Sequence, residues 1–172
     1  MQWVHVVLLG ALGSAMASPA ASEPVSAQAS TTAALDAGIA YYKAADFGAA
    51  RTALRPLADR GSAIAETLMG VMAAKGQGRP ADPAVAAGWW LRAASRGYAP
   101  AQLALAKALA QGKGISADPG QAWVWAKLAS STGNGTATQA LVLADRLFEG
   151  FDAETRARLE TERAAWRPWP GR

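Results

Sequence analysis

The chain has 172 residues, of which 51% are hydrophobic and 17% are charged, and its formal net charge is +4. This composition suits one folded domain with a sizeable apolar core and excludes a wholly disordered chain. The sequence has no Cys and a single His, His5, which excludes disulfides, thiol nucleophiles and thiolate zinc sites. After His5 the sequence has no imidazole that could act as a general base or coordinate a metal. We therefore expect no catalytic residue, no metal site and no cofactor.

The first residues predict a secretory signal peptide. Residues 6–12 form a short apolar run, which Ala15-Met16-Ala17 follows as a small-residue cleavage site. The run is shorter than the roughly 20 apolar residues that span a bilayer, so we expect a cleaved signal over residues 1–17 and no transmembrane segment after its removal. The expected location is the periplasm or the exterior. Because no Lys or Arg precedes the run, an uncleaved, cytosolic, chaperone-like protein is the alternative.

After a Ser-, Ala- and Pro-rich stretch at residues 18–30, which predicts a disordered linker, the sequence repeats itself at an offset of 36 residues. An aspartate recurs at this offset as Asp46, Asp82 and Asp118. A glycine recurs in the same way as Gly61, Gly97 and Gly133. A Gly-x-Gly turn occurs twice, at Gly76, Gly78, Gly112 and Gly114. A period of this length indicates helical units that stack on one another.

Each repeated residue has a structural interpretation. The aspartates are predicted helix N-caps, and in two of the units a proline at the first helical position follows the cap. The three single glycines are predicted to end helices in the left-handed conformation, and the Gly-x-Gly turns to reverse the chain. We expect a helix of about 13 residues, a glycine turn, a helix of about 15 residues and a reversal in each unit.

The fold class that follows is an all-α, α/α superhelical solenoid of about four helix pairs over residues 31–166. Small alanine residues at the helix interfaces allow close helix packing. The expected units are residues 31–61, 63–97, 99–133 and 136–166, followed by a C-terminal tail at 167–172. The last unit is charge-rich, as expected of a terminal cap with one face in water.

Residues 63–97 and 99–133 resemble the Sel-1-like repeat family, a relative of tetratricopeptide repeats, in their alanine-rich helices, Gly-x-Gly turn, following Asp and Trp in the second helix. The resemblance implies a solenoid that acts as an adaptor, often in bacterial export or envelope signalling. Hydrolase or β-lactam-binding activity has been proposed for some secreted, disulfide-containing members. This chain lacks those cysteines.

In tetratricopeptide-type solenoids the first helix of each pair lines the concave groove. On that rule the residues expected in a protein-binding groove are Tyr42, Lys43, Val71, Lys75, Lys107 and Gln111. We hypothesise that the three lysines form a ladder that binds carbonyls or carboxylates of an extended peptide. The alternative is that each lysine only complements the dipole of its own helix C-terminus.

Four tryptophans permit a second interpretation, a stacking platform for a ligand. Trp89 and Trp125 recur at the repeat offset and are predicted core, whereas Trp90 and Trp123 are out of phase and are either ligand contacts or residues packed between units. Asp82 and Asp118 could also be read as a pair of catalytic carboxylates. A helix-cap role explains both residues, so we favour the caps.

The function predicted from the sequence is a non-enzymatic scaffold of the bacterial cell envelope that binds a protein or peptide. The basic pI of 9.8 also fits an anionic envelope polymer, whereas export argues against nucleic acid. The alternative function is a cell-wall-associated hydrolase or a protein that binds β-lactams or peptidoglycan.

Overall fold

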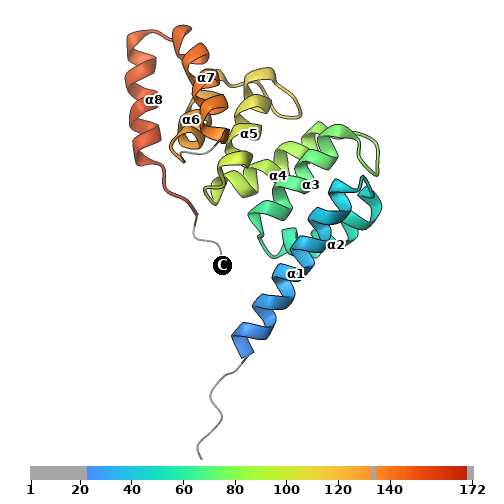
Figure 1. The fold of residues 1–172 in the computed structure, drawn as a ribbon. Coiled ribbons are helices and arrows are strands. Elements are labelled where there is room, and N and C mark those ends of the chain that lie inside the picture. Colours follow the sequence, from blue (N-terminus) through green and yellow to red (C-terminus); the bar gives the residue numbers. More distant parts are fainter. Residues whose placement is uncertain (1–22, 133–134, 170–172) are drawn as a thin grey trace, which may run out of the picture.

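The computed structural model describes residues 23–132 and 135–169, and this part of the chain is helical without strands (Figure 1). Its helices are α1 (Glu23–Lys43), α2 (Phe47–Asp59), α3 (Ala63–Lys75), α4 (Pro83–Ser95), α5 (Ala99–Gln111), α6 (Pro119–Ser130), α7 (Gly135–Glu149) and α8 (Ala153–Ala165). The all-α fold class is confirmed. The expected signal peptide at residues 1–17 and the expected glycine turn at Gly133 lie outside the described residues.

The helices stack in chain order, with α1 near one end of the molecule and α8 at the other (Figure 1). Each of α1 to α6 packs against the helix that follows it. The first helices α3, α5 and α7 also approach one another directly, whereas α2, α4 and α6 approach one another less closely. The first helices therefore lie on the inner side of the curved stack, as in a superhelical solenoid.

The repeated aspartates form the predicted helix caps. One side-chain oxygen of Asp46, Asp82 and Asp118 accepts a hydrogen bond from the backbone N–H three residues later, at 3.0, 3.0 and 2.9 Å. Each bond satisfies an amide that the first helical turn leaves unpaired. Gly61 and Gly97 follow α2 and α4 with a φ of 88° in both cases, so the predicted left-handed helix ends are confirmed at these two positions.

The Gly-x-Gly reversals join the two helices within a unit, α3 to α4 and α5 to α6. Gly78 and Gly114 have φ values of 75° and 73°, which favour glycine. A Cβ on Gly78 would lie 3.2 Å from Phe47 at the start of α2, and one on Gly114 would overlap the carbonyl group of Pro83 at the start of α4. Phe47 and Pro83 are themselves one repeat apart. The second glycine of each turn is thus a stacking contact with the preceding unit.

Alanine dominates the core, as the predicted close helix packing requires. Ala50, Ala86 and Ala122, which share one repeat position, are fully buried. The tryptophans differ from expectation: Trp123, predicted out of phase, is 1% exposed and stacks on Phe148 at a centroid distance of 5.5 Å. Trp123 is therefore too buried to contact a ligand. Its place between α6 and α7 agrees with the other interpretation, a residue packed between units.

Trp89 and Trp125, predicted as core, are only half-buried. The Trp89 ring lies under two guanidinium groups, those of Arg55 at 5.4 Å and Arg92 at 4.6 Å. Trp125 packs edge-on against Trp166 at 5.9 Å. Arginine side chains thus cover the Trp89 ring, and a residue near the C-terminus covers the Trp125 ring. We had expected neighbouring units to bury both rings.

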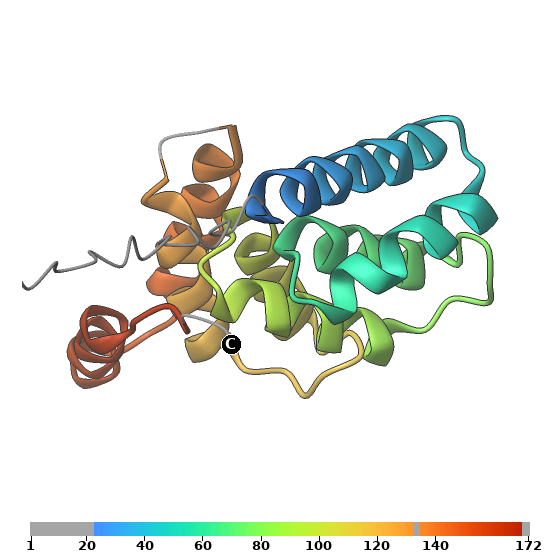
Figure 2. The same ribbon diagram turned by 90° about the horizontal axis from the view of Figure 1, so that it is seen from below.

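Both ends of the stack depart from the predicted pattern. Helix α1 begins at Glu23, so residues 23–30, expected to be a disordered linker, are helical in the structure, consistent with the good helix propensity of their Ala and Gln residues. At the other end α8 approaches α6 more closely than α7 and stands apart from the stack in Figure 2. Its one buried residue is Leu159, which lies against Gly120 of α6.

The segment after α8 returns toward the middle of the chain. The backbone N–H of Trp169 donates to the carbonyl of Ser95 at 2.7 Å, and the Arg96 guanidinium lies 5.4 Å from the Trp169 ring. Residues 167–169, expected to be a tail, are therefore tied to the end of α4.

Candidate functional site: an inner groove along the first helices

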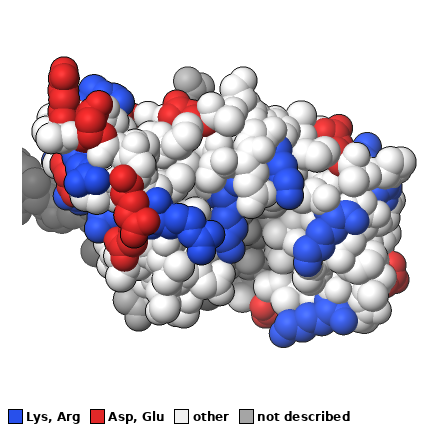
Figure 3. Space-filling view, turned by 90° about the horizontal axis from the view of Figure 1, so that it is seen from above, with Lys and Arg blue, Asp and Glu red and all other residues white. Residues whose placement is uncertain are grey.

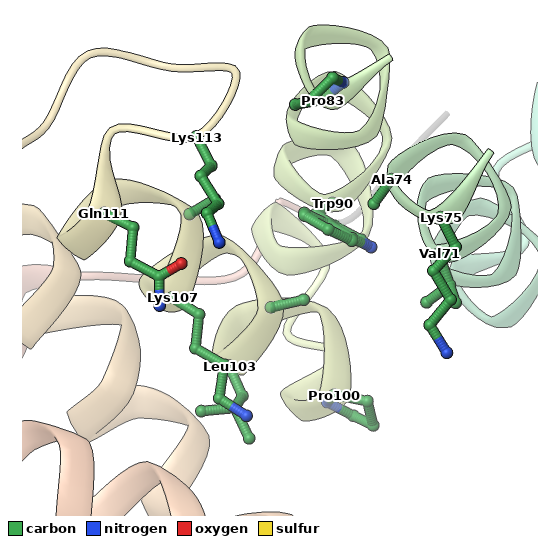
Figure 4. A pocket seen from close by; sticks show the side chains of 12 residues that line it. Val71, Ala74, Lys75, Pro83, Trp90, Pro100, Leu103, Lys107, Gln111 and Lys113 are labelled. Atoms are coloured by element: carbon green, nitrogen blue, oxygen red, sulfur yellow. The ribbon is translucent and has the colours of Figure 1, made fainter. Parts of the chain in front are cut away.

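A cavity of about 410 Å³ lies where α3, α4 and α5 meet (Figure 4). Its residues come from one face of α3, from α4, from one face of α5, and from the turn after α5. They are Val71, Ala74, Lys75, Pro83, Trp90, Pro100, Leu103, Ala104, Lys107, Ala108, Gln111 and Lys113. Most of this lining is aliphatic or aromatic, with long polar side chains at the rim, which is the usual composition of a binding pocket.

A second cavity of about 370 Å³ continues this depression from α5 to α7. Lys107 and Gln111 line both cavities, so the two adjoin along α5. The remaining lining of the second cavity is Thr138, Gln139, Val142, Leu143 and Arg146. We call the two cavities together the inner groove, because the helices that flank them, α3, α5 and α7, are the first helices of their units.

The structure brings together four of the six residues predicted for the groove: Val71, Lys75, Lys107 and Gln111 all line the first cavity. The other two lie elsewhere. Tyr42 is half-buried and packs edge-on against Phe47 at 5.8 Å, and Lys43 is exposed at the end of α1. Neither lines either cavity.

Trp90 occupies the middle of the first cavity, between Val71 and Lys75 on one side and Lys107 on the other (Figure 4). Its indole lies directly on α3, because a Cβ on Gly70 would be only 2.5 Å from the indole nitrogen. At the equivalent positions one repeat later the chain has Ala106 and Ala126. A large residue on α4 is therefore accommodated by the loss of a methyl group on α3.

The charges that line the inner groove are all positive. The first cavity has Lys75, Lys107 and Lys113, the second adds Arg146, and no Asp or Glu lines either one. Lys107 donates a hydrogen bond to the side-chain oxygen of Gln139 at 3.2 Å. At the α8 end of the molecule, by contrast, Lys and Arg lie beside Asp and Glu (Figure 3). The groove thus has a positive field that its own side chains leave unbalanced.

Another site of charged residues lies in α3 and α4, outside the cavity lining. The carboxylate of Glu66 is fully buried and pairs with the Nε atoms of Arg92 at 2.9 Å and Arg96 at 3.5 Å. Burial raises the pKa of Glu66, and the two guanidinium groups offset part of that effect. Arg92 also donates to the carbonyl of Ala58 at 3.0 Å. This arrangement ties the first unit to the second and is structural.

Several groove residues were missed from the sequence alone. Lys113 was interpreted only as part of a turn, and Leu103 had no distinguishing pattern. The one available signal was Trp90, whose position out of helical phase was noted as a candidate ligand contact. Within the described residues no group of three His, Asp or Glu side chains is placed to hold a metal ion. No helix in the same residues is long and apolar enough to cross a bilayer.

Helix pairs that share a repeat offset and stack through their first helices define an α/α solenoid, and the described part of the chain is of this class. A model of the Sel1 repeat matches residues 63–98 and 99–134. These two stretches are therefore Sel1 repeats, which confirms the resemblance stated above. Sel1 repeats generally form protein–protein interaction scaffolds and are typically non-catalytic.

Solved structures that share this fold include two bacterial proteins. A protective antigen present in uropathogenic Escherichia coli strains, which displays an SLR fold, has a TM-score of 0.71 and 23% identity, and the match covers 83% of this chain and 32% of the antigen. A Sel1 repeat protein from Oxalobacter formigenes has a TM-score of 0.57 and 26% identity over 74% of this chain and 58% of the other. The chain therefore spans less than two thirds of either protein. No curated protein matches the sequence.

Proposed function

We propose that this protein is an interaction scaffold of the bacterial cell envelope, and that it binds an extended segment of a partner protein in the inner groove. The observation that carries the proposal is the pair of adjoining cavities along α3, α5 and α7, which four of the predicted groove residues help to line. Elongated grooves on the inner side of helical repeats suit extended ligands. The apolar floor offers buried area, and the polar rim offers hydrogen-bond donors that fix orientation.

Position-specific photo-crosslinking in the native host tests the groove. A photoreactive phenylalanine analogue replaces Gln111, which is exposed at the rim of both cavities, or Ala157, which is exposed on α8 and serves as the control. We expect one discrete adduct from position 111 and none of that mass from position 157. The same adduct from both positions, or adducts from position 157 alone, would contradict binding in the groove.

The envelope location is supported by the apolar run at residues 6–12 and the small residues that follow it. Fractionation of the native host tests it separately from the groove. We expect the protein in the periplasmic or secreted fraction, with an intact mass that corresponds to cleavage at or after Ala17. Recovery of the uncleaved chain in the cytosol would refute the location and leave the binding site unaffected.

A further inference from the structure

Resting on the function proposed above, we propose a chemical class for the occupant of the inner groove: an acidic, extended peptide that inserts one large apolar side chain beside Trp90. Two features of the groove lead to this class independently. The first is the shape and apolar lining of the α3–α4–α5 cavity, and the second is the sign of the charges around it.

The cavity is large enough for an apolar anchor. Its volume of about 410 Å³ lies within the range of roughly 300–1,000 Å³ that is usual for ligand pockets. Trp90, Leu103 and Pro100 provide aromatic and aliphatic walls. An aromatic side chain of a ligand gains both burial and ring contacts in such a site, and anchors of this kind dominate binding energies at protein interfaces.

The rim of the groove selects acidic neighbours of that anchor. Lys107 and Lys113 lie on one side of Trp90 and Lys75 lies on the other (Figure 4). The ligand residues before and after the inserted side chain would therefore each lie near an ammonium group. Arg146 continues the series into the second cavity. Because neither cavity has an acidic lining residue, carboxylates of a ligand would supply the missing counter-charge.

These features are not consequences of the repeat itself. One repeat away from Trp90 stands Ala126, and one repeat away from Lys107 and Lys113 stand Val71 and Gln77. The units stack without the indole or the extra charges at those equivalent positions. The Trp90 cavity and its cations are therefore specific to one junction of the solenoid, as expected of a binding site and not of a packing contact.

The probe for this inference is an acetylated and amidated nonapeptide with a central Phe, two Asp residues on each side of it and Gly-Ser ends, labelled with fluorescein. Binding to the full chain is measured by fluorescence anisotropy at low and at moderate salt. Two control peptides carry Ser in place of the Phe, or Asn in place of every Asp. We expect the intact probe to bind at least about fivefold more tightly than either control, and its affinity to fall as salt rises.

Two pairs of variants locate the binding. The first is the triple substitution K75Q, K107Q and K113Q, with K43Q, R60Q and K127Q as a control that removes the same charge outside the cavity lining. The second is Ala104→Phe, which fills the cavity from a half-exposed position, with Ala157→Phe on the exposed face of α8 as its control. Circular dichroism of each variant establishes that it is folded before binding is measured.

We expect each groove variant to weaken the probe at least about fivefold and each control to leave it unchanged within about twofold. Equal binding of the Ser peptide would overturn the apolar anchor and identify a site for anionic polymers. Equal binding of the Asn peptide, or an unaffected lysine triple variant, would overturn the acidic specificity. Either result is compatible with crosslinking at position 111, so failure of this inference is distinguishable from failure of the proposed function.

Discussion

Substitution of Gly114 by alanine tests the stacking of units at a single atom. Gly114 lies in the reversal between α5 and α6, with a φ of 73°, and an added Cβ would overlap the carbonyl of Pro83 in the preceding unit. The left-handed backbone costs a non-glycine residue about 1–2 kcal/mol. The steric overlap adds about 1–3 kcal/mol, the usual cost of inserting a methyl group where there is no space. We expect a total loss of about 2–5 kcal/mol.

Two other glycines separate the two contributions. Gly78 has nearly the same φ, 75°, but its added Cβ would meet Phe47 at 3.2 Å, a tight contact that needs only a small shift, so Gly78→Ala is expected to lose the backbone contribution of about 1–2 kcal/mol and a smaller steric contribution. Gly88 lies within α4 with nothing within 4 Å of an added Cβ. Gly88→Ala should therefore stabilise the protein by about 0.5–1 kcal/mol through helix propensity.

The assay is urea unfolding followed by circular dichroism at 222 nm, with the free energy of unfolding obtained by linear extrapolation. From the most to the least stable, the expected order is Gly88→Ala, wild type, Gly78→Ala and Gly114→Ala. A Gly114→Ala variant as stable as Gly78→Ala would refute the conclusion that this turn is packed against the preceding unit.

Three further predictions concern the caps, the ion pair and the terminal helix. Asp82→Ala should lose about 1 kcal/mol of unfolding free energy, because it removes the bond to the N–H of Val85, and an unchanged urea midpoint would contradict this. For Glu66, burial raises the pKa above the ordinary 4.5, so its stabilising contribution is complete below that value and is lost as pH rises through the folded pKa. The stability of the wild type minus that of Glu66→Gln, compared by thermal melts, should thus fall as the pH rises from about 4 to 7. A rise of this difference over the same range would contradict a raised pKa of Glu66. Leu159→Ala should lose about 2–5 kcal/mol of α8 docking, seen as faster amide exchange in α8 while exchange in α3 to α5 is unchanged; equal acceleration in both regions would contradict local undocking.

The repeat was predictable because its signals are local. An Asp cap such as Asp82 needs only the amide three residues ahead, and a glycine such as Gly97 needs only its own backbone conformation. Periodicity then multiplied these signals, so that the same residue type occurred at the same place in successive units. Fold class and most helix ends followed from this local chemistry.

The groove was only partly predictable because it depends on contacts between units. Trp90 lines a cavity only because Gly70, on another helix, lacks a side chain, and no pattern along α4 contains that information. Tyr42 lies outside both cavities for a related reason. The turn between α1 and α2 is short, so the end of α1 lies beside Phe47, and Tyr42 packs on that ring instead of facing a groove.

The most direct test of the account is ¹⁹F NMR of the protein labelled with 5-fluorotryptophan and titrated with the Asp–Phe nonapeptide. The chain has seven tryptophans, and a Trp90→Phe sample assigns the resonance of Trp90. We predict that the Trp90 resonance shifts with peptide concentration, while those of the buried Trp123 and of Trp169, bound near α4, keep their positions. A bound peptide that moves other tryptophan resonances and leaves that of Trp90 in place would contradict the groove as the binding site.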